Sequence, residues 1–394
     1  MLQKCHEDPY LRKFKATVAS AQGSLVLLEP NFFFCASGGQ GSDRGEITFE
    51  GKKAKVADVV EEGGKAWLKI EGEIPPQGAE VECSIDWGRR YALMKAHTAE
   101  HMLFQALSRQ FPGVFPEKVS LEPGALSLFM KFHQPLAWEK VLEAEKLVNS
   151  EITAGREVKA EIVGKGEVQE DVRIKSERIG GEKVRVVEVS GFDKVACSGI
   201  HVKNAGELGM FCVQRITSDR PGIWKIDFLV GKEALDFLLG AAKVALSSSQ
   251  ILGTGTDRLE KTVANMRAEE AQGKAVMKEL SDMAFAGLKH EEKNGVRLYS
   301  RIFPAMDAKI LQEWASKLAK SEKTAVIFAV KGAERAFLIF GKSKDVKLDV
   351  RALGAEAFRL MNGKGGGNEF FVSGSGDPAK LEQAVTFLTN SLEK

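Results

Sequence analysis

Two histidines that stand four residues apart are the first candidates for chemistry in this sequence. His97 and His101 enclose Thr98-Ala99-Glu100, and residues i and i+4 lie on one face of a helix, one turn apart. Two imidazoles in this relation can bind one zinc ion. The spacing also arises by chance, and the alternative is two partly buried histidines with ordinary hydrogen bonds.

A second pair with the same spacing strengthens the metal interpretation. Cys197 and His201 enclose Ser198-Gly199-Ile200, whose two small residues allow a tight loop. Zinc favours four ligands that mix thiolate and imidazole. The alternative is a structural cysteine and a surface histidine. We predict one zinc ion per chain, bound by both pairs: His97, His101, Cys197 and His201.

The first pair lies on a predicted helix, and a strand-rich region precedes it. Residues 1–90 contain short strand-like runs bounded by Gly, Pro and Asn, which indicates a small barrel or open sandwich. The runs are 16–18, 25–28, 46–49, 55–60 and 66–70. From residue 91 apolar positions recur at helical spacing, and Pro112 and Pro116 end that helix. We therefore expect the histidine pair on a buried helix that follows a β domain.

The second pair lies in a mixed region. A helix is predicted from about Trp138 to Ala154, and strands are predicted near 159–163, 184–189 and 223–230. Residues 91–230 should therefore form a zinc-binding α+β domain. The fold class of the whole chain is predicted to be α+β.

After Gly231 the composition changes to Ala, Leu, Lys and Glu without proline. An apolar stripe at three- and four-residue steps predicts two helices over 231–292, with a turn at 253–257. They should form a helical hairpin or antiparallel coiled coil, and an ordinary packed helix pair is the alternative. An α/β domain is predicted over 293–394, with paired strands at 325–330 and 336–340, helices at 305–319 and 377–392, and a glycine-rich loop at 362–367.

Composition excludes several classes of protein. The chain has 394 residues, 28% of them charged, and a formal net charge of +2, which argues against a uniformly basic nucleic-acid coat. No run approaches the roughly 20 apolar residues of a membrane span, and no apolar leader follows Met1. Five cysteines are too few for a disulfide scaffold of this length. We expect a cytoplasmic protein with no membrane partner.

Four blocks of sequence, in this order, resemble those of the alanyl-tRNA editing family, which includes the editing domain of alanyl-tRNA synthetase and the free-standing AlaX proteins. Residues 34–45 resemble the glycine-rich motif of the family, and the two metal-binding pairs resemble its zinc half-sites. Residues 202–209 resemble the continuation after the second half-site, and 361–367 resemble the DHHA1-type C-terminal module. The resemblance covers almost the whole chain, which looks like a long-form AlaX protein whose sequence starts at the barrel.

The resemblance implies the activity and the partner. Members of the family hydrolyse the ester that links serine, and often glycine, to alanine tRNA. Pockets sized for alanine discriminate against such amino acids by only ~10–200-fold, so a second hydrolytic site is useful. The expected substrate is therefore mischarged alanine tRNA, and the helical linker or the C-terminal domain could form a homodimer.

The resemblance also suggests roles for individual residues. Gly38 and Gly39 lack side chains and could let the nucleotide approach the backbone. Gln40 could orient the substrate or water, and Thr98 could contact the hydroxyl of serine. Glu100 is a candidate base, although a solvated helix residue is the alternative. A tRNA-binding surface is predicted in the C-terminal loop: Gly363, Lys364, Gly365, Gly366 and Gly367. That loop lacks the Gly-Lys-Ser/Thr of a nucleotide P-loop, so ATP binding is not expected.

Some positions depart from the family pattern. Phe34, Cys35 and Gly41 stand where tyrosine and two prolines are common, and Ser198 and Ile200 replace Gly and Thr in the second half-site. No metal ligand is lost. The changes bear on which amino acid is accepted.

Three other functions remain open. The pattern H-x-x-E-H also occurs in inverzincin metallopeptidases, where Glu100 would be the base and Glu143 or Glu145 the third ligand. A non-catalytic tRNA-binding protein with a structural zinc would carry the same motifs. Serine could also be removed from threonine tRNA.

The near-neutral net charge conceals an uneven distribution. Residues 1–230 carry 31 basic and 33 acidic residues, and 231–292 carry 8 and 10. Residues 293–394 carry 17 and 11, a net charge of +6. We expect the C-terminal domain to bind the tRNA backbone and residues 1–230 to hold the 3′ end.

Overall fold

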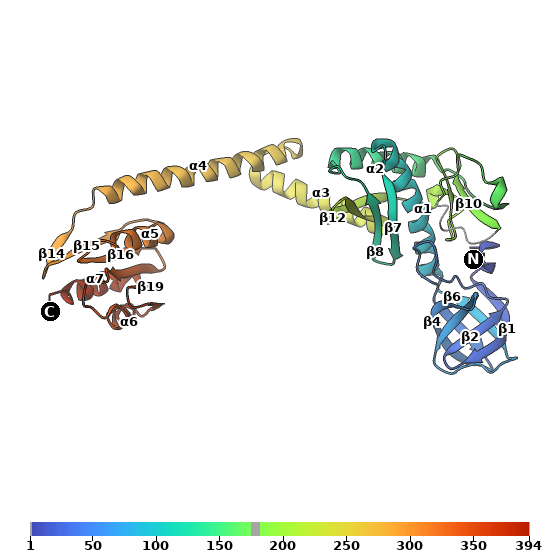
Figure 1. The fold of residues 1–394 in the computed structure, drawn as a ribbon, viewed down its shortest axis with the longest axis horizontal. Helices are drawn as coiled ribbons and strands as arrows, with labels where there is room; N and C mark the ends of the chain where they lie inside the picture. Colours follow the sequence, from blue (N-terminus) through green and yellow to red (C-terminus); the bar gives the residue numbers. More distant parts are fainter. Residues whose placement is uncertain (1, 175–181, 394) are drawn as a thin grey trace. The chain divides into compact units, whose positions relative to one another are not determined.

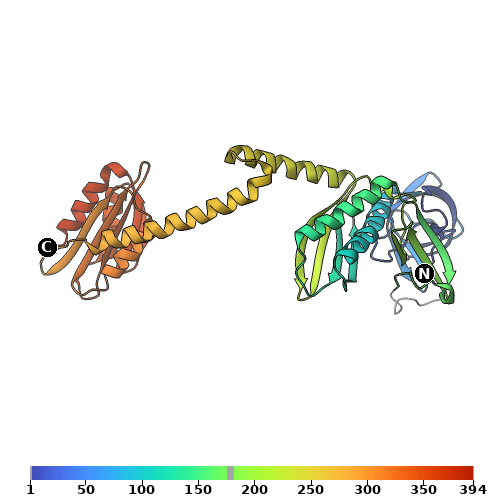
Figure 2. The ribbon, with the colours of Figure 1, turned by 90° about the horizontal axis from the view of Figure 1, so that it is seen from above.

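The computed structural model describes residues 2–174 and 182–393, which fall into two compact units, 1–248 and 249–394. Figures 1 and 2 show the elements of each unit. The strand, helix and loop content confirms a mixed α+β chain.

The first unit begins with a closed antiparallel barrel of six strands in the order β1-β2-β5-β4-β3-β6. Their bounds are β1 (Lys13–Gln22), β2 (Leu25–Glu29), β3 (Gly45–Phe49), β4 (Lys52–Glu62), β5 (Lys65–Glu71) and β6 (Glu80–Ile85). The barrel prediction is confirmed, and β6 is the one barrel strand that was not predicted from the sequence. Val81, Cys83 and Ile85 of β6 alternate into the barrel core, as expected of a half-buried strand.

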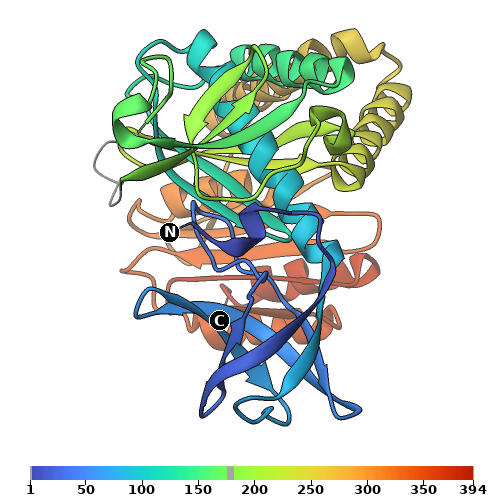
Figure 3. The same cartoon turned by 90° about the vertical axis from the view of Figure 1, so that its right-hand side faces the viewer.

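Helix α1 (Trp87–Gln110) starts next to the barrel and crosses the rest of the unit (Figure 3). The Asp86 side chain accepts a hydrogen bond from the Arg89 amide and caps the helix. Helix α2 (Trp138–Ala154) packs on α1 and ends at Gly155, whose φ of 63° suits a left-handed cap. The bounds of α2 agree with the prediction.

Both helices pack on a four-stranded antiparallel sheet in the order β12-β13-β8-β7. The strands are β7 (Phe115–Glu122), β8 (Ala125–Lys131), β12 (Phe211–Arg220) and β13 (Ile223–Val230). Of these four, only β13 was predicted. Pro116 does follow the end of α1, but it lies inside β7, because an edge strand tolerates a missing N–H donor. A three-stranded sheet, β11-β10-β9, completes this part of the unit: β9 (Val158–Gly164), β10 (Lys183–Val189) and β11 (Asp193–Ala196).

Helices α3 (Lys232–Leu252) and α4 (Leu259–Ala286) confirm the two predicted helices and the break between them. Gly253 has a φ of 61°, which explains the residue type at this turn. By length and composition alone, α3 could cross a membrane, contrary to the expectation that no stretch approaches this length. Soluble proteins contain such helices too, and Asp236 and Lys243 within α3 would each cost about 2.5–3.5 kcal/mol near the centre of a bilayer.

The second unit contains a six-stranded sheet in the order β14-β15-β16-β17-β19-β18. Its elements are β14 (Glu291–Lys293), β15 (Val296–Phe303), α5 (Ala308–Leu318), β16 (Thr324–Lys331), β17 (Ala336–Lys342), α6 (Val350–Leu360), β18 (Lys364–Gly367), β19 (Phe371–Gly376) and α7 (Leu381–Asn390). Alternate residues of β16 pack against α6 and α7 on one face and against α5 on the other. This two-sided burial explains the continuous apolar run in β16.

The predicted glycine-rich loop is in fact edge strand β18, paired with β19. A Cβ atom on Gly365 would lie 2.4 Å from Cε2 of Phe358 and 2.6 Å from the Ser373 carbonyl oxygen. Glycine therefore lets α6 pack directly on the strand backbone. The Gly and Lys residues suggested a loop because glycine is depleted in strands.

Candidate metal centre and cavity

Helix α1 and the loop after β11 bring both predicted metal-binding pairs together in the first unit. His97 and His101 lie on one face of α1, with ring centroids 5.0 Å apart. Cys197 and His201 come from the irregular segment after β11. One ligand atom from each of the four residues lies within 4.8 Å of the others, so this His/Cys cluster could bind a metal ion.

Two of the donor separations fit a tetrahedral site. The Cys197 Sγ atom lies 3.4 Å from His97 Nε2 and 3.5 Å from His201 Nε2. Bonds of about 2.0–2.3 Å to a tetrahedral zinc ion place ligand atoms about 3.5 Å apart. The donor types and their spacing therefore match a closed Cys/His₃ zinc site.

The outer ring nitrogens support the same geometry. His97 Nδ1 donates to the Gln40 side-chain oxygen at 2.8 Å, and His201 Nδ1 donates to Thr98 Oγ1 at 3.2 Å. His101 Nδ1 lies 3.9 Å from an Asp193 carboxylate oxygen and has no hydrogen-bond partner in the described structure. Metal-binding histidines usually present one nitrogen to the ion while the other faces such an acceptor.

Burial keeps the cluster uncharged in the absence of an ion. Desolvation, followed by the charge of Arg185, lowers the pKa of His97 to about 3. Desolvation also lowers the pKa of His101 and His201 and raises that of the Cys197 thiol to about 11. Neutral imidazoles have the free lone pair that a metal requires, and a bound cation favours the thiolate form of cysteine.

Arg185 of β10 holds the second half-site in place. Its guanidinium donates to the carbonyl oxygens of Cys197 at 3.1 Å and Gly199 at 2.8 Å. Gly199 itself must be a glycine, because a Cβ atom there would lie 2.1 Å from His97 Cε1. Burial lowers the pKa of Arg185. Its hydrogen bonds to two carbonyl oxygens give the guanidinium a structural role.

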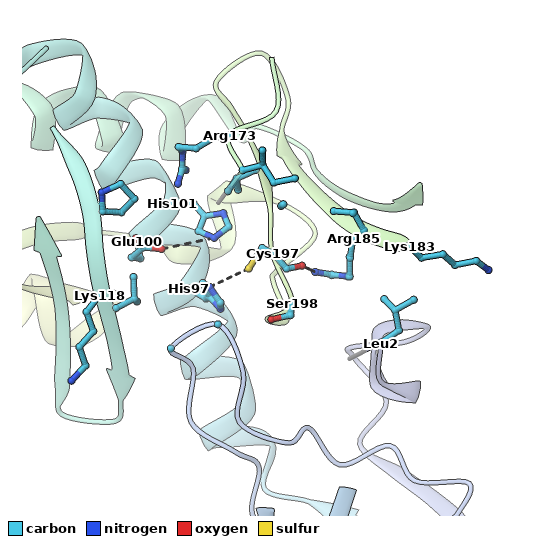
Figure 4. Close-up of a pocket in the computed structure, with 18 of the residues that line it drawn as sticks. Leu2, His97, Glu100, His101, Lys118, Arg173, Lys183, Arg185, Cys197 and Ser198 are labelled. Atoms are coloured by element: carbon cyan, nitrogen blue, oxygen red, sulfur yellow. Dashed lines mark hydrogen bonds and ion pairs between the residues drawn. The ribbon is translucent and has the colours of Figure 1, made fainter. Parts of the chain in front are cut away.

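A cavity of about 890 Å³ opens beside the cluster (Figure 4). Three cluster residues, His97, His101 and Cys197, line it together with Gly38 and Gly39. The remaining wall includes a set of basic side chains from β7, β10 and the irregular segment before β10: Lys118, Arg173, Lys183 and Arg185. The cavity thus combines backbone without side chains, a possible metal, these four basic side chains and three carboxylates, Glu100, Glu117 and Glu182.

The glycine-rich block reaches the cavity by pairing alongside β7. The Gly41 amide donates to the Leu121 carbonyl oxygen, and the Leu121 amide donates to that of Gly39. A Cβ atom on Gly39 would lie 2.6 Å from the Val119 carbonyl oxygen, and its φ is 83°. Glycine is therefore required by this close approach as well as by the backbone conformation.

The other predicted site residues occupy different places. Glu100 is 3% exposed and lines the cavity, with a carboxylate oxygen 3.8 Å from His101 Nε2, so the alternative of a solvated helix residue is wrong. Gln40 and Thr98 are buried against the histidines and are not among the lining residues. The predicted tRNA-binding residues, 363–367, lie in the second unit.

Three residues of this site were missed by sequence reasoning: Arg173, Arg185 and Asp193. Arg185 interrupts the buried valine run of β10, and a charge inside such a run is the signal that could have identified it. Asp193 follows a turn and Arg173 an irregular segment, so no periodicity marks them. The peptidase alternative also loses a ligand here, since the Glu145 carboxylate accepts from the Val213 amide instead.

Comparisons with known proteins agree with this arrangement. Residues 184–227 match the threonyl and alanyl tRNA synthetase second additional domain, and 295–394 match the DHHA1 domain. The chain is 31% identical over 395 residues to an alanine–tRNA ligase of Pyrobaculum aerophilum, with 96% of this chain covered. A ligase of the same name from Archaeoglobus fulgidus is 29% identical over 388 residues, with 94% covered.

The chain spans less than half the length of these relatives, 43% and 41% respectively. A crystal structure of the C-Ala domain from Aquifex aeolicus alanyl-tRNA synthetase matches 27% of this chain and 99% of that chain, with 24% identity and a TM-score of 0.26. The similarity in sequence therefore extends over both units.

Proposed function

The chain combines an alanyl-tRNA synthetase-like editing domain with a DHHA1 domain, as a long-form AlaX protein does, and from this premise we propose that it deacylates mischarged alanine tRNA. One observation carries the proposal: three residues of the His/Cys cluster form part of the wall of a cavity large enough for an aminoacylated nucleotide. The substrates proposed are seryl- and glycyl-tRNA of the alanine type.

The cavity supplies binding and orientation for such a 3′ end. The backbone of Gly38 and Gly39 is open to close approach by the ribose, because neither residue has a side chain. Arg173 and Lys118 on the wall provide positive charge for the terminal phosphates. The basic side chains and the glycine backbone would hold the ester next to the cluster.

Glu100 is the residue we assign to proton transfer. It lines the cavity next to His101 and would accept the proton of the attacking water, a role worth about 10²–10⁴-fold in rate. A bound zinc ion would supply Lewis-acid polarisation of the ester or a fixed site for the amino group. Because the four protein ligands fill a tetrahedral shell, this would require one ligand to be displaced or the coordination number to rise to five. We assign Gln40 and Thr98 to holding His97 and His201, because their hydrogen bonds are directed at these rings.

The second unit would anchor the body of the tRNA. Residues 293–394 carry a net charge of +6, and β18 presents Lys364 on an exposed sheet edge. Backbone amides along an unpaired edge are donors to phosphate oxygens. We propose that 363–367 contact the tRNA backbone without chemistry of their own.

The decisive experiment is release of the amino acid from serylated, glycylated and alanylated alanine tRNA under multiple turnover. We expect serine release well above the spontaneous rate and slower release of alanine. His97→Ala should abolish release together with zinc, whereas Glu100→Gln should keep zinc and lower the rate about 10²–10⁴-fold. Zinc is measured by elemental analysis on the same samples.

Three other outcomes would identify the alternatives. Binding of tRNA and zinc without any amino-acid release would indicate a tRNA-binding protein with a structural metal. Zinc retained in Cys197→Ala would contradict the Cys/His₃ site and support a peptidase-type centre. Faster release from serylated threonine tRNA than from alanine tRNA would change the partner.

A further inference from the structure

The four-stranded sheet of the first unit has an outer face of which the catalytic proposal uses only Lys118. The start of α3 covers this face at Cys212, and its other end is exposed. The inner face of the sheet packs into the core with α1 and α2 (Figure 2) through four apolar side chains: Leu128, Met130, Ile226 and Phe228. Neighbouring side chains along a strand point to opposite faces. The residues between these core positions therefore point outward.

The strand register places the outer-face residues in rows across the sheet. Lys118 of β7 pairs with Phe129 of β8, Phe129 with Lys225 of β13, and Lys225 with Thr217 of β12. The Lys118 ammonium lies 5.6 Å from the centre of the Phe129 ring, within the range of a cation–π contact. The row thus places an aromatic side chain between two cations. The backbones of Lys118 and Lys225 are two strand spacings apart, about 10 Å.

Positive charge on this face exceeds what nearby carboxylates neutralise. Lys225 pairs with Asp227 at 2.8 Å, and Arg220 pairs with Glu117 at 3.1 Å. In the described residues no carboxylate lies within ion-pair distance of three further exposed cations on the face, Lys118, Lys131 and Arg215. Arg215 is nevertheless the cross-strand neighbour of Asp227, whose charge it partly balances. An exposed surface with unpaired lysine and arginine suits a polyanion.

The outer face is continuous with the cavity. Residues 116–119 of β7 line the cavity mouth, and Lys118 belongs both to that lining and to the row across the sheet. A strand that enters the cavity with its 3′ end would reach the face at Lys118. This continuity, together with the charge, favours a nucleic-acid strand over a protein as the occupant.

We propose that the outer face of this sheet, formed by Lys118, Phe129, Lys131, Arg215, Thr217 and Lys225, binds the acceptor strand of the tRNA whose 3′ end occupies the cavity. The inference rests on the proposed function and adds a second RNA contact, in the first unit. Lysine and arginine contact phosphates, Thr217 adds a hydroxyl donor, and Phe129 offers a ring for stacking. Such contacts position the RNA without reading its sequence.

The test uses the full chain and two cations that do not line the cavity. The double variant Lys131→Ala and Arg215→Ala should raise KM for serylated tRNA about tenfold or more and leave kcat unchanged. It should also weaken binding of an uncharged acceptor-stem minihelix and lower the salt slope of that binding by about 2. The matched control is Lys65→Ala and Lys69→Ala, two exposed lysines of β5 in the barrel, which should leave both measurements unchanged.

The outcomes separate this inference from the proposed function. If the native chain releases serine but the double variant keeps the native KM and salt slope, the face is not an RNA surface. If the native chain releases no serine, the deacylase proposal fails, while minihelix binding still tests the face. Equal losses in the double variant and the β5 control would mean that net charge alone acts, which also overturns the inference.

Discussion

His97 can present only one ring nitrogen to a metal, because the Gln40 side chain binds the other. The Gln40 oxygen accepts from His97 Nδ1 at 2.8 Å and from the Ile200 amide at 3.1 Å. It therefore joins α1, the glycine-rich block and the second half-site at a single atom. Loss of this acceptor frees the His97 ring and the loop that carries Cys197.

Gln40→Ala should therefore weaken zinc binding about 10–100-fold, the usual effect of removing such an acceptor. Gln40→Glu keeps an acceptor oxygen and should recover much of the affinity. Affinity is measured by competition with a chelator, and thermal unfolding of the same samples reports on folding. Native affinity in Gln40→Ala would contradict a positioning role.

A buried ion pair fixes the glycine-rich block to α1. Asp43 and Arg90 bond to each other with side chains 1% and 0% exposed, and Arg90 also donates to the carbonyl oxygens of Phe32 and Leu11. Asp43→Ala should destabilise the first unit by about 3–5 kcal/mol, because a buried guanidinium then lacks its counter-charge. Urea unfolding measures the change.

The matched control for that variant is an exposed pair on the same barrel. Glu46 and Lys53 lie 2.7 Å apart with side chains 42% and 68% exposed, so Glu46→Gln should cost about 0–1 kcal/mol. Similar losses in the two variants would mean that burial does not govern the Asp43 pair.

The residues of the metal cluster were predictable because each pair has a local spacing that carries chemistry. Neither Arg185 nor Asp193 has such a spacing. Arg185 acts on the carbonyl oxygens of residues 12 and 14 positions away, and Asp193 faces His101 from another element. Contacts of this kind follow from tertiary packing, which a single sequence does not display.

At the scale of elements, Gly365 of β18 lets α6 pack closely on the strand. Substitutions of Gly365 and its neighbour Gly366 test this packing. Gly365→Ala should destabilise the second unit, because its Cβ atom would overlap Phe358 and displacement of a core ring costs about 1–3 kcal/mol. Gly366→Ala is the matched control, since a Cβ atom there would meet nothing within 4 Å. Thermal unfolding should show a lower midpoint only for Gly365→Ala.

Helix α4 exposes apolar side chains in a repeating position. Val263 and Met277 stand two heptads apart, as do Met266 and Leu280, and all four are at least 43% exposed. The heptad between them carries Glu270 and Gly273 at the corresponding positions, so the apolar seam consists of two short segments, and each suits pairing with a second helix. We expect a homodimer through α4, and Met277→Glu with Leu280→Glu should give monomers in light scattering. Unchanged mass in that variant would exclude this seam.

The elements that sequence patterns predicted are those with a clean period. Helix α2 and the barrel strands β2, β3 and β5 alternate or repeat regularly, and their predicted bounds lie within one residue of the structure, whereas β1 is longer than predicted and β6 was missed. By contrast, β7 contains Pro116, and β12 exposes most of its length at 214–220. Their pairing with β8 and β13 overrides these weak local signals.

At the scale of the whole molecule, the proposed function divides the contacts with RNA between the two units. Residues 293–394 carry a net charge of +6, whereas 1–230 carry −2 in total, although basic side chains of the first unit line part of the cavity. Affinity for the body of a tRNA should therefore depend on the second unit, while turnover depends on a small site whose cluster is buried.

This division predicts different responses to salt. Raising the salt concentration should weaken tRNA binding steeply, because each phosphate contact releases counter-ions. The rate constant at saturating substrate should change little, since the buried cluster and Glu100 are shielded from added ions. Filter binding and single-turnover deacylation over the same salt series measure the two quantities.

Lys364 connects the salt response to a particular residue. Lys364→Ala should lower the salt slope by about 1 and weaken binding of full-length tRNA without changing the saturated rate. Lys320→Ala, which removes an exposed lysine from the same unit, is the matched control and should leave the slope unchanged. If the saturated rate falls with salt as steeply as binding does, the charged contacts act in the chemical step itself. The separation of anchor and site between the two units would then be wrong.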